Sequence, residues 1–260
     1  MISLRHPSGA RAEVVEHGAQ VMSFVDASGR ERLYRGASGT VASDGWIRGG
    51  VPVVFPQFAD RGPLPMHGFA GTRDWSVVAV GESSATLQLS DDEATRRLWS
   101  HAFRAELDVR LSTELSVALT VWNTGESPFD FTAALHTYFA VDDVHQSQIA
   151  GLSRCNYRDK LRGFAEFVDV DPAIVIGAHT DRVYEQAPAT VRVNDLVLVT
   201  SGFGDWVVWN PWDEMTRRLS DMRPDDYLRM VCVEAARIAR PVELRPREAW
   251  TGTQVMRVKP

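Results

Sequence analysis

Cysteine is nearly absent from this chain of 260 residues, which contains only Cys155 and Cys232. Two cysteines cannot build the disulfide framework of a small secreted domain or a cysteine-based zinc cluster. No apolar run approaches the length of about 18 residues that a membrane-spanning helix needs, and the N-terminal residues lack the apolar core of a signal peptide. We therefore expect a reduced, cytoplasmic setting and no association with a membrane.

An excess of charge of one sign is also missing. The chain has 28 Lys and Arg against 34 Asp and Glu, a net charge of −6, and both signs are interspersed along it. Nucleic acids and anionic membranes favour a basic surface, so we expect neither as the main partner. A small anionic ligand remains possible, because it needs only two or three local cations. No oversized apolar patch indicates a dimer interface, and we expect a monomer.

Several catalytic signatures are missing as well. The sequence has no glycine-rich phosphate loop and no G-x-S-x-G motif, and its histidines show neither H-x-H nor H-x-x-x-H spacing. It has no internal repeat and no low-complexity segment. Strands do not alternate with helices, which disfavours Rossmann and barrel architectures. These absences argue against nucleophile-based hydrolases and give no support for a metal site.

Alternation of apolar and polar residues is the dominant pattern that is present. Residues 103–111 and 115–121 alternate with period two around a short turn, which predicts a hairpin with one face in the core. Helical patterning is confined to 91–100 and 213–222, and irregular loops are expected at 44–72 and 151–184. We predict an all-β chain, a single domain over residues 1–260 built as a large antiparallel β-sandwich with a few short helical turns. Further strands are expected at 12–15, 20–25, 75–80, 85–89, 190–193, 206–209, 229–234 and 251–258.

Two polar residues lie within apolar, strand-like segments. In residues 129–139 most odd positions are apolar, which places His136 on the opposite face together with Thr132 and Tyr138. Glu234 follows four apolar residues, and a glutamate is rarely buried unless it is paired or functional. Burial would raise the pKa of its carboxyl toward the range of a general base. The alternatives are a structural histidine bonded to a backbone carbonyl and a structural Glu–Arg pair.

Two segments rich in glycine and proline contain further candidates. Residues 46–58 include paired glycines and two prolines, which prevent a regular central strand. Arg48 in this segment can present its guanidinium to an oxyanion or a sugar hydroxyl. In residues 64–75, His67 is followed directly by Gly68, which suits a loop that brings an imidazole close to a ligand. A surface arginine and a solvent-facing histidine are the alternative interpretations.

Taken together, these segments resemble the hexose-6-phosphate mutarotases, or glucose-6-phosphate 1-epimerases, a branch of the aldose 1-epimerase superfamily. The resemblance runs from about residue 45 to residue 236. It implies a β-sandwich of the galactose-mutarotase type that acts on a sugar or sugar phosphate without a metal or organic cofactor. The matching segments occur in family order: I-R-G-G-V-P-V-V-F-P-Q-F (47–58), L-P-M-H-G-F-A (64–70), A-L-H-T-Y-F (134–139), T-D-R-V-Y (180–184), W-N-P-W (209–212) and M-V-C-V-E-A (230–235).

The resemblance also implies roles for individual residues. His136 would be the acid that protonates the ring oxygen, and Glu234 the base that takes the proton of the anomeric hydroxyl. His67 would hold the sugar near its ring oxygen. Arg48 would face the phosphate, and Asp181 a sugar hydroxyl.

The sequence departs from the family at one position that concerns substrate binding. Family members commonly carry arginine after H-G-F-A, whereas this chain has Gly71. Arg73 is the candidate replacement, and Gln57 is a further candidate substrate ligand. Three functions follow: a mutarotase for hexose 6-phosphates, a mutarotase for unphosphorylated aldoses, and a non-catalytic carbohydrate-binding β-sandwich.

Overall fold

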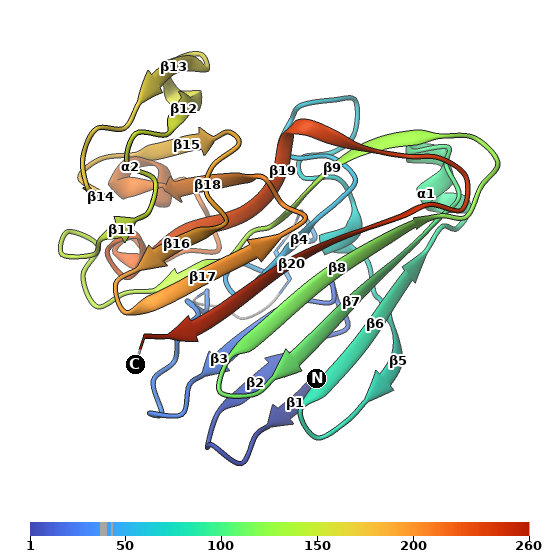
Figure 1. The fold of residues 1–260 in the computed structure, drawn as a ribbon, viewed down its shortest axis with the longest axis horizontal. Coiled ribbons are helices and arrows are strands. Elements are labelled where there is room, and N and C mark those ends of the chain that lie inside the picture. The colour runs from blue at the N-terminus through green and yellow to red at the C-terminus, as the bar shows by residue number, and fades with distance from the viewer. Residues whose placement is uncertain (37–40, 43, 260) are drawn as a thin grey trace.

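Strands are the main secondary structure of the chain (Figure 1). The computed structural model describes residues 1–36, 41–42 and 44–259. The helices are short: α1 (Glu93–Leu98), α2 (Trp212–Thr216) and the 3-10 turns η1 (Ala70–Thr72), η2 (Lys160–Arg162) and η3 (Asp226–Leu228). The strands are β1 (Ile2–Arg5), β2 (Arg11–Val14), β3 (Val21–Val25), β4 (Val53–Val54), β5 (Ser76–Val80), β6 (Ser84–Ser90), β7 (Phe103–Leu111), β8 (Leu115–Asn123), β9 (Phe129–Leu135), β10 (Tyr138–Ala140), β11 (Ile149–Ala150), β12 (Asn156–Asp159), β13 (Ala165–Val168), β14 (Ala173–Ile174), β15 (Thr180–Tyr184), β16 (Thr190–Val193), β17 (Leu196–Ser201), β18 (Asp205–Asn210), β19 (Met230–Leu244) and β20 (Ala249–Val258).

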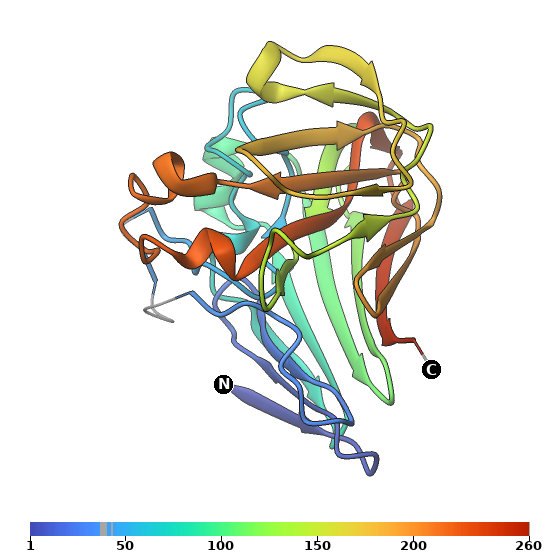
Figure 2. The same cartoon turned by 90° about the vertical axis from the view of Figure 1, so that its left-hand side faces the viewer.

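The strands form two large antiparallel sheets and one small sheet. The first large sheet has the order β13-β12-β15-β18-β19-β9-β4, with β10 also paired to β19. The second has the order β14-β11-β16-β17-β20-β8-β7-β6-β5, and β1-β2-β3 form the small sheet. Figure 2 shows the α2–η3 segment at one side of the molecule, near the blue segment that precedes β4.

The main core lies between the two large sheets. Its buried cluster draws alternate residues from both, for example Leu107 of β7 and Leu119 of β8 on one side and Leu135 of β9 and Val233 of β19 on the other. Period-two alternation turns these side chains to one face and their neighbours to the opposite face. The hairpin expected from the sequence is therefore confirmed, with β7 and β8 paired along their length.

The β9–β18–β19 part of the first sheet is buried on both faces. Its second face carries one apolar group that includes Ala134, Val207 and Ala236, and another that includes Tyr138 and Cys232. A strand covered on both sides reads as a continuous apolar run, as β19 does from Met230 onward. A polar side chain on this second face is consequently removed from bulk water.

Three sequence expectations need correction. The segment 151–184, expected to be an irregular loop, contains η2 and the strands β12 to β15; these strands have five residues or fewer, and β13 and β14 are the edge strands of the two large sheets. The helix expected at 213–222 ends at Thr216, and the one expected at 91–100 is limited to 93–98. None of the helices in the described ranges is long and apolar enough to cross a membrane.

Candidate active site

Strand register brings His136 and Glu234 together. In the antiparallel pair β9–β19, Leu135 lies opposite Ala235. His136, the residue after β9, is therefore next to Glu234 of β19. His136 Nε2 lies 3.4 Å from Glu234 Oε1. The His136 backbone N–H donates to the Pro52 carbonyl at 2.9 Å, which fixes the histidine just beyond the end of β9.

The pair is buried, but part of its hydrogen-bonding capacity is unused. The Glu234 side chain is 2% exposed and that of His136 is 12% exposed. Within the part of the chain that the structure describes, Glu234 Oε2 and His136 Nδ1 have no hydrogen-bond partner. Buried polar atoms are rarely left unpaired, and exceptions are typical of sites that bind a ligand. The alternative interpretation, a structural Glu–Arg pair, is not formed within the described residues, where the ionisable neighbour of Glu234 is His136.

Burial shifts the pKa values of the two side chains in opposite directions. Burial, assisted by the negative charge of Asp181, raises the pKa of Glu234 well above its ordinary value. Burial also lowers the pKa of His136 well below its ordinary value, and the charges of His67 and Arg48 add to the effect. Both shifts favour the uncharged form of each group, a neutral imidazole beside a protonated carboxyl, over an ion pair.

His67 lies beside this pair as a neutral imidazole. Its backbone has φ +63°, the left-handed region, in the loop before Gly68, and its ring centroid is 5.4 Å from that of His136. The Ala59 backbone N–H donates to His67 Nδ1 at 3.2 Å, so Nε2 carries the proton of the neutral ring. Burial lowers the pKa of His67 to about 4. His67 is thus a hydrogen-bond donor across the physiological pH range.

Arg48 reaches the same site through Tyr138. The Tyr138 ring stacks on His136 with centroids 4.8 Å apart and planes at 11°, and its hydroxyl accepts from Arg48 Nη1 at 3.0 Å. Arg48 Nε donates to Asp221 Oδ2 at 2.9 Å. Burial alone would lower the pKa of Arg48, but Tyr138 and Asp221 outweigh it and hold the pKa above its ordinary value.

The charge of Asp181 acts on Glu234, and Asp181 has a lysine neighbour that the sequence patterns did not indicate. Asp181 on β15 lies opposite Trp209 of β18, which in turn lies opposite Cys232 of β19. Burial raises the pKa of Asp181 to about 6 despite Lys160, whose Nζ lies 3.8 Å from Asp181 Oδ2. The charge of Lys160 also lowers the pKa of Glu234. The composition could have drawn attention to Lys160, because it is one of only two lysines among the 28 basic residues of the chain.

For two predicted ligands, Gln57 and Arg73, the described residues show no hydrogen bond or ion pair with His136 or Glu234. The Gln57 amide donates to the Ala59 and Leu64 carbonyls and accepts from the Leu64 N–H, so it closes its own loop. The charge of Arg73 acts on Asp92, at the start of α1. Neither observation shows a group directed at His136 and Glu234.

Trp46 occupies the space beside Gly71. A Cβ atom placed on Gly71 would overlap the Trp46 ring, and the same ring packs edge-on against His67 with centroids 5.8 Å apart. A side chain at position 71 therefore requires Trp46 to move. The glycine and the tryptophan form one packed unit at the His67 side of the site.

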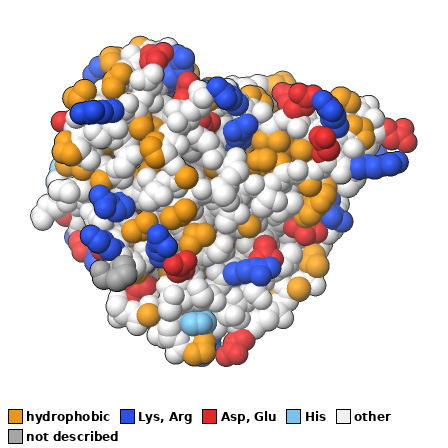
Figure 3. Space-filling view, in the orientation of Figure 1, with side chains coloured by type: hydrophobic (Ala, Val, Ile, Leu, Met, Phe, Trp, Pro, Cys, Tyr) orange, Lys and Arg blue, Asp and Glu red, His pale blue; other side chains and the backbone are white. Residues whose placement is uncertain are grey.

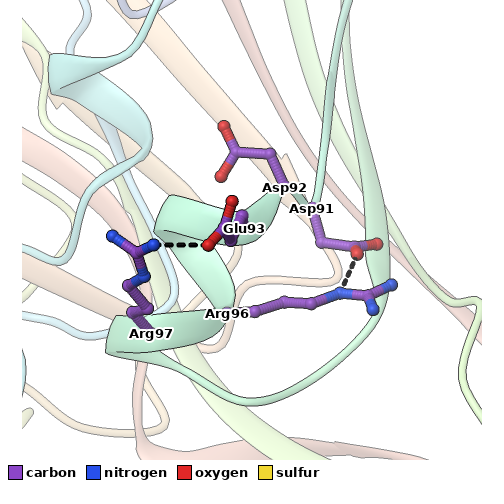
Figure 4. Close-up of a pocket in the computed structure, with 5 residues that line it drawn as sticks. All are labelled: Asp91, Asp92, Glu93, Arg96 and Arg97. Atoms are coloured by element: carbon purple, nitrogen blue, oxygen red, sulfur yellow. Dashed lines mark hydrogen bonds and ion pairs between the residues drawn. The ribbon is translucent and has the colours of Figure 1, made fainter.

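One surface pocket lies away from these residues. It is lined by residues 91–93, 96 and 97 around α1, where Arg96 pairs with Asp91 and Arg97 with Glu93 (Figure 4). Each arginine therefore has an acidic partner; Arg96, Arg97 and Glu93 are exposed, whereas Asp91 is largely buried. Acidic and basic side chains both scatter over the face that Figure 3 shows. Among the described residues, no group of three or more His, Cys, Asp or Glu could hold a metal ion.

Comparison with known proteins decides the family. The family model described as aldose 1-epimerase matches residues 1–257. The chain belongs to the aldose 1-epimerase family. It is an isomerase that interconverts the anomers of a sugar, and its fold is the galactose-mutarotase β-sandwich.

Three relatives place this aldose 1-epimerase more closely. A protein from Cenchrus ciliaris, provisionally named glucose-6-phosphate 1-epimerase, is 34% identical over 96% of this chain and 82% of its own length. A protein from Escherichia coli K12 with the same provisional name is 32% identical over 91% of this chain and 82% of its own length. The crystal structure of a provisionally assigned mutarotase from Salmonella typhimurium superposes with a TM-score of 0.89 at 27% identity, covering 99% of this chain and 89% of that one.

Proposed function

We propose that this aldose 1-epimerase interconverts the α and β anomers of a hexose 6-phosphate, with His136 and Glu234 as the acid–base pair. The observation that carries the chemistry is the buried contact between these two side chains. Each has one buried polar atom with no hydrogen-bond partner among the described residues. The phosphate is supported by the names of the relatives and by the two cations, Arg48 and Lys160, that flank the pair. We further propose that the protein is cytoplasmic, in keeping with its two unpaired cysteines. We also propose that it is a monomer.

A single proton on the pair is sufficient for the reaction. In ring opening, the proton of the pair moves from Glu234 to His136, which lie 3.4 Å apart. His136 donates it to the ring oxygen while the Glu234 carboxylate takes the proton of O1, and the bond between C1 and the ring oxygen breaks. The aldehyde then rotates about C1–C2. In closure on the other carbonyl face, Glu234 returns its proton to O1 and His136 takes one from the C5 hydroxyl, which restores both groups. Acid–base catalysis of this kind contributes about 10²–10⁴-fold per group.

The remaining side chains hold the sugar in this mechanism. His67 donates from Nε2 to an oxygen near the ring oxygen, because its Nδ1 is already an acceptor. Asp181 accepts from a sugar hydroxyl on the Glu234 side of the ring. Arg48 lies on the His136 side, where Tyr138 connects it to the acid.

An unphosphorylated aldose is the second candidate substrate. It is favoured by one observation: the charge of Arg48 is already balanced by Asp221. Exchange rates between the α and β signals, measured by saturation-transfer NMR on glucose 6-phosphate and on glucose, distinguish the two candidate substrates. Greater efficiency on the phosphate supports our proposal, whereas equal or lower efficiency supports the free sugar.

Replacing Arg48 tests the assignment of the phosphate to this residue. We expect Arg48→Ala to raise KM for glucose 6-phosphate by about 10- to 100-fold, as for loss of a charge-assisted contact, and to raise KM for glucose much less. Arg110→Ala is the matched control, because this exposed arginine pairs with Asp108 on β7, a strand of the second large sheet. Equal losses on both sugars would mean that Arg48 contacts the sugar rather than the phosphate.

A further inference from the structure

Asp221 and Arg48 form an ion pair next to the proposed acid. The Arg48 side chain is 18% exposed and that of Asp221 is 10% exposed. The carboxylate accepts from both Nε, at 2.9 Å, and Nη2, at 3.4 Å. It thereby covers the same two-donor edge of the guanidinium that would bind a phosphate in a bidentate manner.

The connectivity of the substrate brings the 6-phosphate to this edge. C6 is bonded to C5, and C5 is bonded to the ring oxygen, so the phosphate lies on the ring-oxygen side of the sugar and away from O1. With His136 at the ring oxygen, the cation reached through Tyr138 is Arg48. Lys160 is reached instead through Asp181, on the Glu234 side.

Phosphate and Asp221 therefore compete for one cation. A dianion placed beside an intact Arg48–Asp221 pair meets a neutral pair and a nearby carboxylate, so its attraction to the arginine is largely cancelled. In the described part of the chain, the Asp221 carboxylate accepts hydrogen bonds only from Arg48. Its neighbour Met222 is buried against Tyr138 and Cys232, which keeps the segment between α2 and η3 at the site.

We propose that Asp221 determines the phosphate selectivity of this enzyme by occupying Arg48 until a phosphate replaces it. This inference rests on the proposed function, because it specifies how the same site discriminates between a hexose 6-phosphate and a free hexose. A free hexose has no anion to exchange and leaves the pair intact. A hexose 6-phosphate binds only as the carboxylate leaves, so the carboxylate weakens phosphate binding without blocking it.

The test removes the charge of Asp221 and keeps its shape. In Asp221→Asn, we expect KM for glucose 6-phosphate and the inhibition constant of inorganic phosphate against glucose turnover both to fall by about tenfold, with KM for glucose changed by less than about twofold. Asp225→Asn is the matched control: it removes the same charge from the same segment, and Asp225 is exposed with no side-chain cap bond on η3. We expect it to leave both constants unchanged.

Three results would overturn the inference. Weaker or unchanged phosphate binding in Asp221→Asn would mean that the carboxylate only positions Arg48. Equal gains in Asp225→Asn would mean a general effect of net charge. Loss of phosphate binding in Lys160→Met, with Arg48→Ala unaffected, would place the phosphate at the lysine.

A second variant and a second readout keep the test independent of folding and of turnover. Removal of one partner from a buried ion pair can destabilise a protein. Asp221→Ala is therefore measured alongside Asp221→Asn, and thermal melting is recorded for both variants. We expect the same gain in phosphate affinity from each. Calorimetric titration with inorganic phosphate needs no turnover. If the wild-type enzyme accelerated no hexose 6-phosphate, the proposed function would fail, yet tighter phosphate binding by the variant would still support the exchange on Arg48.

Discussion

Replacing Glu234 with glutamine is expected to lower kcat for anomer exchange by about 10³-fold, within the range for loss of a general base. The amide keeps the volume of a side chain that is 2% exposed, but it cannot take the proton of O1 in ring opening or return it in closure. Exchange between the α and β signals of glucose 6-phosphate, followed by saturation-transfer NMR, measures the loss. We expect KM to change much less than kcat, because the proton transfer belongs to the transition state.

Glu243→Gln provides the control for this variant. Glu243 lies on the same strand, β19, but is exposed, so the same chemical change there is expected to leave the exchange rate unaltered. Near-native exchange in Glu234→Gln, with a normal melting temperature, would remove Glu234 from the mechanism. It would also favour the carbohydrate-binding interpretation if the wild type were equally slow.

Replacing His136 with asparagine is expected to have a similarly large effect, about 10²–10⁴-fold on kcat. Asparagine can bond to the ring oxygen but cannot deliver a proton to it. The fold should persist, because the histidine is held mainly by its backbone N–H bond to Pro52, which the substitution retains. The matched control is His145→Asn, at an exposed histidine outside the site.

The double variant distinguishes a pair from two independent groups. If His136 and Glu234 pass one proton between them through the substrate, the second substitution should cost little once the first is made. Losses that multiply in the double variant would contradict a shared proton. A His136→Asn enzyme that retained native exchange would remove His136 from the mechanism and leave His67 as the candidate acid.

Local patterns in the sequence predicted the all-β architecture and the face that His136 occupies. Alternation in residues 129–139 separates the core side chains from the site side chains, and Leu135 and Ala134 indeed belong to different buried clusters. Period two is a property of the strand itself, so it can be read without knowing the partner strand. The strand expected at 229–234 ends at Glu234, whereas β19 continues beyond this residue to Leu244.

Contacts between segments distant in the chain could not be predicted in this way. The partner of Arg48 is Asp221, 173 residues away, and no spacing or periodicity connects them. Lys160 lies in a region expected to be an irregular loop, and only the pairing of β12 with β15 brings it to Asp181. Gln57 matched a family segment by sequence, but its amide is used within its own loop. Sequence similarity predicts which residue is present, whereas the tertiary fold decides what that residue contacts.

The most direct measurement of the proposed function is the rate of anomer exchange catalysed by the wild-type protein on glucose 6-phosphate, galactose 6-phosphate, glucose and galactose, each followed by saturation-transfer NMR against the spontaneous rate. We expect clear acceleration on at least one hexose 6-phosphate, with a higher kcat/KM than on the corresponding free hexose. Acceleration on no hexose would contradict the catalytic role of the His136–Glu234 pair.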